Sequence, residues 1–427
     1  MIRSVAEQAL KSIQDLGFDQ SAVRVVTDEF HELQAENGEI NLMRTNFETD
    51  VALTGILAHK KASLSVNKTD SESLESATAN LKDMAQAATA DSAHGIAEAQ
   101  ANETFDAGLD KPDYDAMYDR IVELQSYAKQ TYPSLNLGSV GVTFENRLSC
   151  YLNSNGVQFE SRRGLYRVST AFTSKEGSLA SSMMFTGYSS YNLDTAIHES
   201  VDVDRLLRES TQQVRTQHIP SKFVGDLVMT PDCVLGFLGF LTMRIGSGPM
   251  IAGTSVYKDK LGEEVASPLL NLSSRPVDDQ ISSGYWVTGD GYKAENSQII
   301  ENGVLATYLL GLYGANKTGL ERAINAGGCY VVEAGDTKYE DMIASVEQGV
   351  LITRFSGGNP NDRGDFSGIA KNSYYIKDGR IQYPIKETTV SGNMVELLHA
   401  IKSISKERFN YGGKIVPWIC AGGVTVS

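Results

Sequence analysis

The sequence is poor in the residues that bind metals or form disulfides. It contains four cysteines and six histidines in 427 residues, and no two cysteines are spaced as C-x-x-C. Thiolate zinc sites and thioredoxin-like redox motifs depend on such a pair. The cysteines are therefore expected to be reduced and to pack in the interior, as free cysteines usually do. They are Cys150, Cys233, Cys329 and Cys420.

Long apolar runs are also absent. The most apolar stretch, VLGFLGFLTM at 234–243, is too short to cross a bilayer. Glu7, Lys11 and Asp15 interrupt the first helical pattern, where a signal peptide would stay apolar. We expect no membrane association and a cytoplasmic location.

Basic residues are too few to favour nucleic acid. Lysine and arginine total 38 against 53 aspartates and glutamates, which gives a net charge of -15. No dense run of basic residues offsets this charge. A phosphate backbone is repelled by such a surface, so direct nucleic-acid binding is not expected.

One short motif points towards metal chemistry. His198-Glu199 forms the first half of H-E-x-x-H, but Asp202 stands where the second histidine belongs. One hypothesis is an unrecognised metal site in which Asp202 and Asp204 join this pair, because imidazole and carboxylate are suitable ligands. The favoured interpretation is a solvated helix start, with His198 and Glu199 at the surface.

Two glycine-rich segments resemble ligand loops without completing them. GLYGANKT at 311–318 has Asn316 where a phosphate-binding loop needs glycine, so a turn between strand and helix is expected. NPNDRGD at 359–365 places Arg363 at a calcium-ligand position, so calcium is not expected. The wider SGGNPNDRGDFSG at 356–368 is typical of an exposed loop, or of a rim that contacts a peptide or partner.

Strand and helix patterns alternate without regular β-α order. Asn37-Gly38, Asn155-Gly156, Asn302-Gly303 and Asp378-Gly379 predict hairpin turns. Apolar spacing predicts helices at 2–16, after a capping box at Thr69 and Glu72, after Pro112, near 194–215, from 230, at 337–348 and at 393–406. The fold class is therefore α+β: two mixed regions with antiparallel sheets, followed by a strand-rich domain with packed helices.

Three domains are expected along the chain. An N-terminal α+β domain at 1–108 ends in a linker, because residues 91–112 lose all periodicity. A middle α+β domain spans 109–220, and a strand-rich C-terminal domain spans 221–427.

The C-terminal half resembles the TldD/PmbA family. The resemblance rests on GVLITRFSGGNPNDRGDFSGIAKNSYYIKDGRIQYPIKE, IENGVLATYLLGLYGANKTGL and the closing VPWICAGGVTVS. ENGEINLMRTNFETDVAL and NSNGVQFESRRG extend it over nearly the whole chain. One departure is Asn372, where members usually carry glycine, and we expect a local effect on a turn.

The resemblance implies a paired assembly with metalloprotease activity on unfolded or short peptides. Members were once called modulators of DNA gyrase. The TldD branch holds zinc with H-E-x-x-x-H on a helix and a later cysteine, whereas the PmbA/TldE branch lacks this set and serves as the partner subunit.

The residues present favour the second branch. The resemblance equates the family's metal helix with TPDCVLGFLGFLTMRIG. Residues Leu227 to Gly262 contain no histidine and no glutamate. The six motif positions are predicted near Gly239–Arg244, and the later cysteine's context reads NYGGK at 410–414. We therefore expect no catalytic residue, cofactor or metal ligand in this chain, and a helix that packs as core.

Three functions follow from this interpretation. The first is a non-catalytic subunit that shapes a peptide cleft beside a TldD-like zinc subunit. The second is an independent peptide- or protein-binding homodimer, and the third is a metallopeptidase with an unrecognised site. Contact with peptide or partner is predicted at Gly364, Asp365, Phe366 and Ser367.

Overall fold

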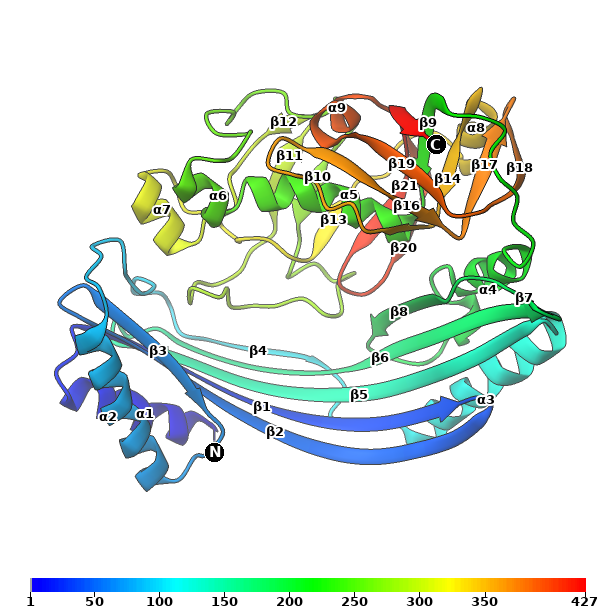
Figure 1. The fold of residues 1–427 in the computed structure, drawn as a ribbon. Coiled ribbons are helices and arrows are strands. Elements are labelled where there is room, and N and C mark those ends of the chain that lie inside the picture. The colour runs from blue at the N-terminus through cyan, green and yellow to red at the C-terminus, as the bar shows by residue number, and fades with distance from the viewer. Residues whose placement is uncertain (1) are drawn as a thin grey trace.

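The computed structural model describes residues 2–427. Its first half forms one curved sheet in the order β3-β2-β1-β5-β6-β4, with β7 and β8 also paired to β6 (Figure 1). Neighbours are antiparallel, except that β4 is parallel to β6. The strands are β1 (Gln20–Glu36), β2 (Glu39–Leu57), β3 (Lys60–Val66), β4 (Glu103–Gly108), β5 (Leu135–Asn153), β6 (Gln158–Glu176), β7 (Leu179–Ala180) and β8 (Met184–Ser190).

The predicted hairpin turns of this sheet are confirmed. Asn37 and Gly38 join β1 to β2 with φ of 50° and 90°, the left-handed values that a tight hairpin turn requires. Gly156, with φ of 85°, lies in the turn between β5 and β6.

Helices cover the two ends of the first sheet (Figure 1). α1 buries Ala6, Ala9 and Ile13 against the sheet, as the 3.6-residue spacing predicted. The face predicted for α3 is also buried. The helices are α1 (Ile2–Asp15), α2 (Ser71–Ala87), α3 (Tyr114–Thr131) and α4 (Val203–Gln212).

Three local predictions in this half were wrong. The cap of α2 is Asp70, whose carboxylate accepts the Ser73 N–H at 2.9 Å, so the box at Thr69 and Glu72 does not form. The predicted linker at 91–112 contains β4, because backbone pairing with β6 orders it without an apolar pattern. The predicted helix near 194–215 is a 3-10 turn at Ile197–Glu199 followed by the shorter α4.

The second half forms a mixed sheet in the order β12-β11-β10-β13-β21-β9-β14-β17-β18, extended by β15, β16, β19 and β20. The β13–β21 and β9–β14 pairs are parallel. The strands are β9 (Phe223–Met229), β10 (Leu272–Ser274), β11 (Ser297–Glu301), β12 (Val304–Leu305), β13 (Tyr330–Val332), β14 (Gln348–Ile352), β15 (Arg354–Ser356), β16 (Asp365–Lys371), β17 (Ser373–Lys377), β18 (Arg380–Ile385), β19 (Thr388–Asn393), β20 (Ile401–Asn410) and β21 (Ile415–Val426).

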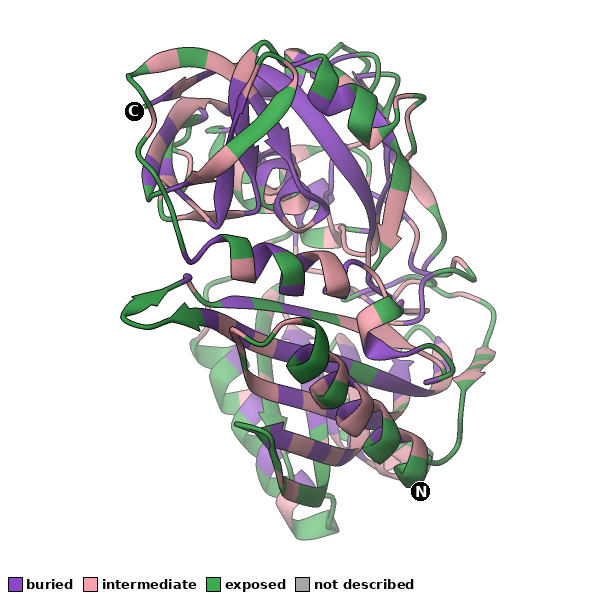
Figure 2. Ribbon diagram, turned by 90° about the vertical axis from the view of Figure 1, so that its right-hand side faces the viewer, coloured by how far each residue is buried: buried purple, intermediate pink, exposed green. Residues whose placement is uncertain are grey.

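Helices of this half pack on and around the sheet, and Figure 2 shows its inner strands as largely buried. The predicted turns at Asn302-Gly303 and Asp378-Gly379 join β11 to β12 and β17 to β18. The helices are α5 (Pro231–Arg244), α6 (Ser247–Ala252), α7 (Leu312–Thr318), α8 (Tyr339–Ala344) and α9 (Met394–His399).

Two predictions were wrong here. The helix expected at 393–406 stops at His399, and β20 follows. Irregularities in the β20–β21 pairing let Ile401 and Ile404 both face inward, which imitates helical spacing. The segment at 311–318 is the helix α7 itself, with Gly311 as its cap, and not the turn that was expected.

The predicted α+β class is confirmed, with two sheets and packed helices. The first sheet draws strands from both 1–108 and 109–220, and the division into three domains stays a prediction. All four cysteines are free, and all but Cys329 are fully buried. Within residues 2–427, no helix is long and apolar enough to cross a membrane.

Candidate functional site

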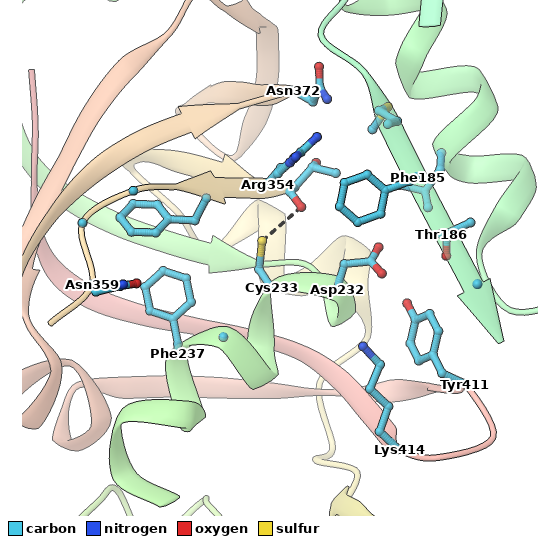
Figure 3. A pocket seen from close by; sticks show the side chains of 18 of the residues that line it. Phe185, Thr186, Asp232, Cys233, Phe237, Arg354, Asn359, Asn372, Tyr411 and Lys414 are labelled. Carbon is cyan, nitrogen blue, oxygen red and sulfur yellow. Dashed lines mark hydrogen bonds between the residues drawn. The ribbon is translucent and has the colours of Figure 1, made fainter. Parts of the chain in front are cut away.

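A cavity of about 680 Å³ lies between the two sheets, and we name it the seam cavity (Figure 3). One wall is β8 of the first sheet. The opposite wall is formed by the start of α5, by β15 with the loop 357–360, and by residues between β20 and β21. Segments far apart in the sequence therefore meet at this site.

The start of α5 places four residues on the seam cavity. Thr230 caps the helix and Pro231 occupies its first turn, where a missing N–H costs nothing. The lining residues then follow helical spacing, which puts them on one face. They are Asp232, Cys233, Gly236 and Phe237.

The rest of α5 is core, as predicted. Phe237, Leu238, Phe240 and Leu241 are at most 4% exposed, and Leu235 is half-buried against the same cluster. Apolar burial on this scale stabilises the helix in place.

Cys233 is a packed thiol at the cavity wall. Its Sγ donates to the Thr353 carbonyl at 3.0 Å (Figure 3). Burial raises the pKa of this thiol to about 12, and the nearby Asp232 adds to the rise. The thiolate is the nucleophilic form, so Cys233 is a poor nucleophile at neutral pH.

Behind the wall, one guanidinium meets three carboxylates. Arg205 of α4 forms ion pairs with Asp202, with Glu209 at 2.9 Å and with Asp232 at 3.5 Å. The Asp202 side chain is fully buried and that of Glu209 is 9% exposed, whereas that of Asp232 is 25% exposed and lines the seam cavity. Asp232 is thus the accessible member of a buried acidic cluster.

The environment of Asp232 disfavours its charged form. Burial is the main cause, the charge of Asp202 adds to it, and the pKa of Asp232 is raised to about 7. Arg205 and Lys414 act in the opposite direction without overcoming the rise. At neutral pH this carboxyl is therefore close to half-protonated.

Tyr411 and Lys414 complete this end of the seam cavity (Figure 3). Tyr411 is 5% exposed, and its hydroxyl makes no hydrogen bond. Burial, reinforced by Asp232, raises the pKa of the phenol, which stays protonated. The Lys414 Nζ lies 4.4 Å from the centre of the Tyr411 ring.

The residues around the seam cavity do not fit a catalytic zinc. Such a site needs three protein ligands and an open position. The lining offers one carboxylate and one protonated thiol, and no histidine. No group of three His, Cys, Asp or Glu in residues 2–427 is arranged to hold a metal ion.

The window Gly239–Arg244, where the zinc motif was predicted to align, does not line the seam cavity. Arg244 is 8% exposed and pairs with Asp362 beneath the 357–364 loop. The cavity-facing part of α5 lies one to two turns earlier, at Asp232–Phe237. The alignment of the zinc motif to Gly239–Arg244 stays a prediction.

His198 and Glu199 lie at a separate, open depression of about 480 Å³. The His198 ring stacks on Tyr127, with 3.8 Å between ring centres, so His198 is half-buried and not a free surface residue. Asp204 accepts hydrogen bonds from the Tyr127 and Tyr132 hydroxyls at 2.6 and 2.7 Å.

The structure brings the four residues of the metal hypothesis to this one depression. Asp202 pairs with Arg205, Asp204 is engaged by the two tyrosines, and Glu199 is exposed. Among residues 2–427 they do not form a group of three that could hold a metal ion.

The predicted contact residues 364–367 lie at the start of β16, beside the seam cavity but not on its wall. Gly364 adopts φ of 94°, and Asp365 accepts from the side chains of Asn361 and Asn393 at 3.1 and 2.9 Å. Phe366 is 4% exposed and packs on Phe237, while Ser367 is exposed. Their contact with a peptide or partner stays a prediction.

Sequence reasoning missed the acidic end of the seam cavity. Asp232 follows Thr230-Pro231 at the predicted helix start, but no sequence pattern indicates that it lies close to Arg205 or Tyr411. Lys414 ends the NYGGK segment, whose sequence indicated only that the family's cysteine is absent. The first half of the glycine-rich loop, residues 357–360, does reach the cavity.

Comparison with known proteins gives a consistent result. Residues 224–427 match the PmbA/TldA metallopeptidase C-terminal domain. Metalloprotease PmbA of Escherichia coli O157:H7 is 22% identical over 429 aligned positions, which cover 95% of this chain and 92% of that protein.

Two solved structures share the fold over the full length. A candidate modulator of DNA gyrase from Bacteroides thetaiotaomicron superposes with a TM-score of 0.88 at 22% identity, covering all of this chain and 98% of that one. TldE from Thermococcus kodakarensis superposes with a TM-score of 0.84 at 20% identity, covering 99% and 100%. These structures establish the shared fold, and the family resemblance predicted from the sequence is confirmed by the domain match over residues 224–427.

Proposed function

Because the chain belongs to the PmbA/TldD family, we propose that it is the non-catalytic subunit of a two-chain metalloprotease acting on unfolded or short peptides. The zinc would reside in a TldD-like partner. The observation that carries this proposal is the wall of the seam cavity, where α5, the helix that the resemblance equates with the family's metal helix, presents Asp232, a protonated Cys233, Gly236 and Phe237 and no histidine.

The metalloprotease name of the PmbA relative makes an independent enzyme the natural rival. That rival needs a metal-binding or nucleophilic set within this chain. Burial keeps Cys233 a thiol, and Asp202 and Asp204 are engaged by Arg205 and by tyrosines. These contacts support a subunit that binds substrate and partner without performing the cleavage.

Strand β8 offers the seam cavity a backbone edge for an extended peptide. It pairs with β6 on one side, and on the other the Ser189 N–H donates to the Tyr411 carbonyl at 3.0 Å. Alternate residues of a strand direct N–H and C=O to the same side, so Phe185 and Gly187 direct theirs towards the cavity. Addition of a peptide strand uses such groups and needs no special side chains.

The test is reconstitution from two purified chains. This chain and a TldD-like protein from the same genome are purified separately and assayed alone and mixed on an unfolded protein and on short peptides. We expect little cleavage by this chain, cleavage by the mixture, and zinc only in the partner. The matched control is a partner whose motif histidines are changed to alanine.

The alternatives predict different patterns. An independent homodimer would form a stable pair alone and give no gain on mixing. A metallopeptidase with its own site would contain about one zinc per chain, cleave alone, and lose both properties on His198→Ala. A mixture as inactive as the separate chains contradicts the proposal.

A further inference from the structure

The acidic end of the seam cavity contains an incompletely paired carboxyl group. Three carboxyl groups, those of Asp202, Glu209 and Asp232, surround the guanidinium of Arg205. Lys414 faces the same cluster, yet within residues 2–427 its ammonium lies within 4.0 Å of no carboxylate. Ionisation of all three carboxyl groups would place three negative charges beside two positive ones, so Asp232 is only partly ionised near neutral pH.

Asp232 is the member of the cluster that faces the seam cavity, whereas Asp202 and Arg205 line the separate depression beside His198. Asp232 makes the longest of the three ion pairs with Arg205, at 3.5 Å, and is the one carboxylate of the three that lines the cavity. A buried carboxylate that is incompletely paired is costly, so a cation supplied from the cavity would lower the free energy of this arrangement.

An independent observation also points to a ligand. The Tyr411 hydroxyl lines the same end, in a residue that is 95% buried, and makes no hydrogen bond. Oδ1 of the fully buried Asp202 is also unpaired, but Asp202 lines the separate depression beside His198 and not the seam cavity. Buried polar groups in native proteins are nearly always paired, so unpaired ones beside a cavity indicate a missing partner.

The rest of the seam cavity is mixed: Arg354, Asn359 and Asn372 line it beside a group of apolar side chains, and that apolar group restricts what can carry the partner. Phe237, Phe185 and Phe355 line it, together with Met184 and Met394. Phe237 and Phe355 pack against each other, with 5.5 Å between ring centres. A hydrated metal ion would gain nothing from this wall, whereas an amine that carries an apolar group would bury that group here.

We propose that the acidic end of the seam cavity binds a primary ammonium group. The Asp232 carboxylate accepts from the ammonium as its counter-ion, and the Tyr411 hydroxyl oxygen accepts a second of its hydrogens. The apolar group next to the ammonium packs between Phe237 and Phe185. Lys414 occupies the adjacent space and moves aside.

Two sources supply this chemistry: the α-amino end of a peptide and a lysine side chain. This inference rests on the proposed function in so far as that function supplies peptides as ligands. Binding itself requires this chain alone, so it can be measured without the partner subunit.

The test is titration calorimetry of the purified full-length chain with three probes at pH 7.5. They are leucyl-alanine amide, its N-acetyl form, and N-acetyl-lysine methylamide. We expect the free-amine dipeptide to bind about tenfold or more tightly than its acetylated form, the difference that one charge-assisted contact typically gives. Comparable affinity for the lysine probe would identify the side-chain source, and weak binding of that probe the α-amino source.

Variants assign the effect to the named residues. Asp232→Asn removes the negative charge at nearly constant shape and should abolish the preference for the free amine. Tyr411→Phe should reduce it several-fold, and Lys414→Gln should tighten binding. Asp378→Asn, at a side chain that is 76% exposed on the β17–β18 turn, is the matched control and should change nothing.

Three outcomes would overturn the inference: equal affinity for free and acetylated dipeptide, an Asp232→Asn variant that keeps the preference, or no binding at millimolar peptide. Each is independent of reconstitution. If mixing with the partner still produces cleavage while amine binding is absent, the proposed function stands and the ammonium site does not.

Discussion

The guanidinium carbon of Arg205 lies 4.9 Å from the centre of the Trp418 ring. Arg205 belongs to α4, which packs on the first sheet, and Trp418 lies on β21 in the second. The flat face of the guanidinium therefore contacts Trp418 in the second half, while its N–H groups pair with the carboxylates of the acidic cluster.

Arg205→Met should be strongly destabilising. It leaves three carboxylates without their shared cation, and breaking a buried ion pair by removing one partner typically costs about 3–5 kcal/mol. The free energy of unfolding in urea measures the loss. Arg208→Met, at an exposed position of the same helix, is the control and should stay within about 0.5 kcal/mol of the parent. Equal effects at both positions would contradict a special role for the cluster.

Asp232 should make the chain less stable as pH rises. Its pKa is about 7 when folded, against about 3.9 when unfolded. Between these values the folded state binds more protons, so the free energy of unfolding falls with pH, and this fall is complete above about pH 7. Asp232→Asn removes it.

The gain in stability from Asp232→Asn should therefore be small near pH 4 and grow to about 1–3 kcal/mol above pH 7. Urea unfolding at pH 5 and pH 8 checks this difference between the two proteins. Asp378→Asn should show no such trend. A gain that shrinks as pH rises would reverse the sign and contradict the raised pKa.

Gly236 should accept a side chain and thereby close the seam cavity. A Cβ built there meets no atom within 4 Å, and replacement of a helical glycine by alanine typically stabilises by about 0.5–1 kcal/mol. Gly236→Leu should then fill the cavity and prevent binding of the free-amine dipeptide. Gly239→Leu is the control: it lies on the same helix, has the same open space and does not line the cavity.

The predicted contact segment at the start of β16 should divide into a packing residue and a surface residue. Phe366→Ala removes a ring from the cluster with Phe237 and Phe355, and such changes cost about 3–5 kcal/mol. Ser367→Ala at the neighbouring exposed position should leave stability unchanged. If Ser367→Ala weakens peptide cleavage by the reconstituted mixture, this segment contacts substrate or partner; unchanged cleavage argues against that contact.

Phe185→Pro tests the peptide edge of β8. Proline removes one N–H on the cavity side and keeps the pairing with β6, so cleavage by the mixture should fall while the fold persists. Phe185→Ala controls for loss of the ring, which is 57% exposed. Thr186→Pro, which removes an N–H on the β6 side, should destabilise the sheet. Equal cleavage by the Phe185→Pro and Phe185→Ala variants would exclude a role for the backbone.

Local patterns predicted the local structure well. The spacing of Ala6, Ala9 and Ile13 located α1, and Asn37-Gly38 located the first hairpin, because both signals act over a few residues. β4 was not predicted, because it forms a strand through backbone pairing with β6, more than 50 residues further along the chain. β20 was read as helix because bulges brought Ile401 and Ile404 to one side.

The seam cavity could not be predicted in the same way. Its acidic end joins Arg205, Asp232 and Tyr411 from three elements, and the properties of Asp232 arise from burial that exists only in the folded chain. The family resemblance drew attention to α5, but to its residues Gly239–Arg244, whereas the residues of that helix that line the cavity are Asp232–Phe237.

The position of the seam cavity has a thermodynamic consequence. β8 belongs to the first sheet and α5 packs on the second, and a backbone hydrogen bond from the Ser189 N–H to the Tyr411 carbonyl joins the two halves beside the cavity. A molecule seated there adds contacts to both halves at once and stabilises the folded chain according to its concentration relative to its Kd. Filling the cavity should therefore raise the free energy of unfolding of the two halves together.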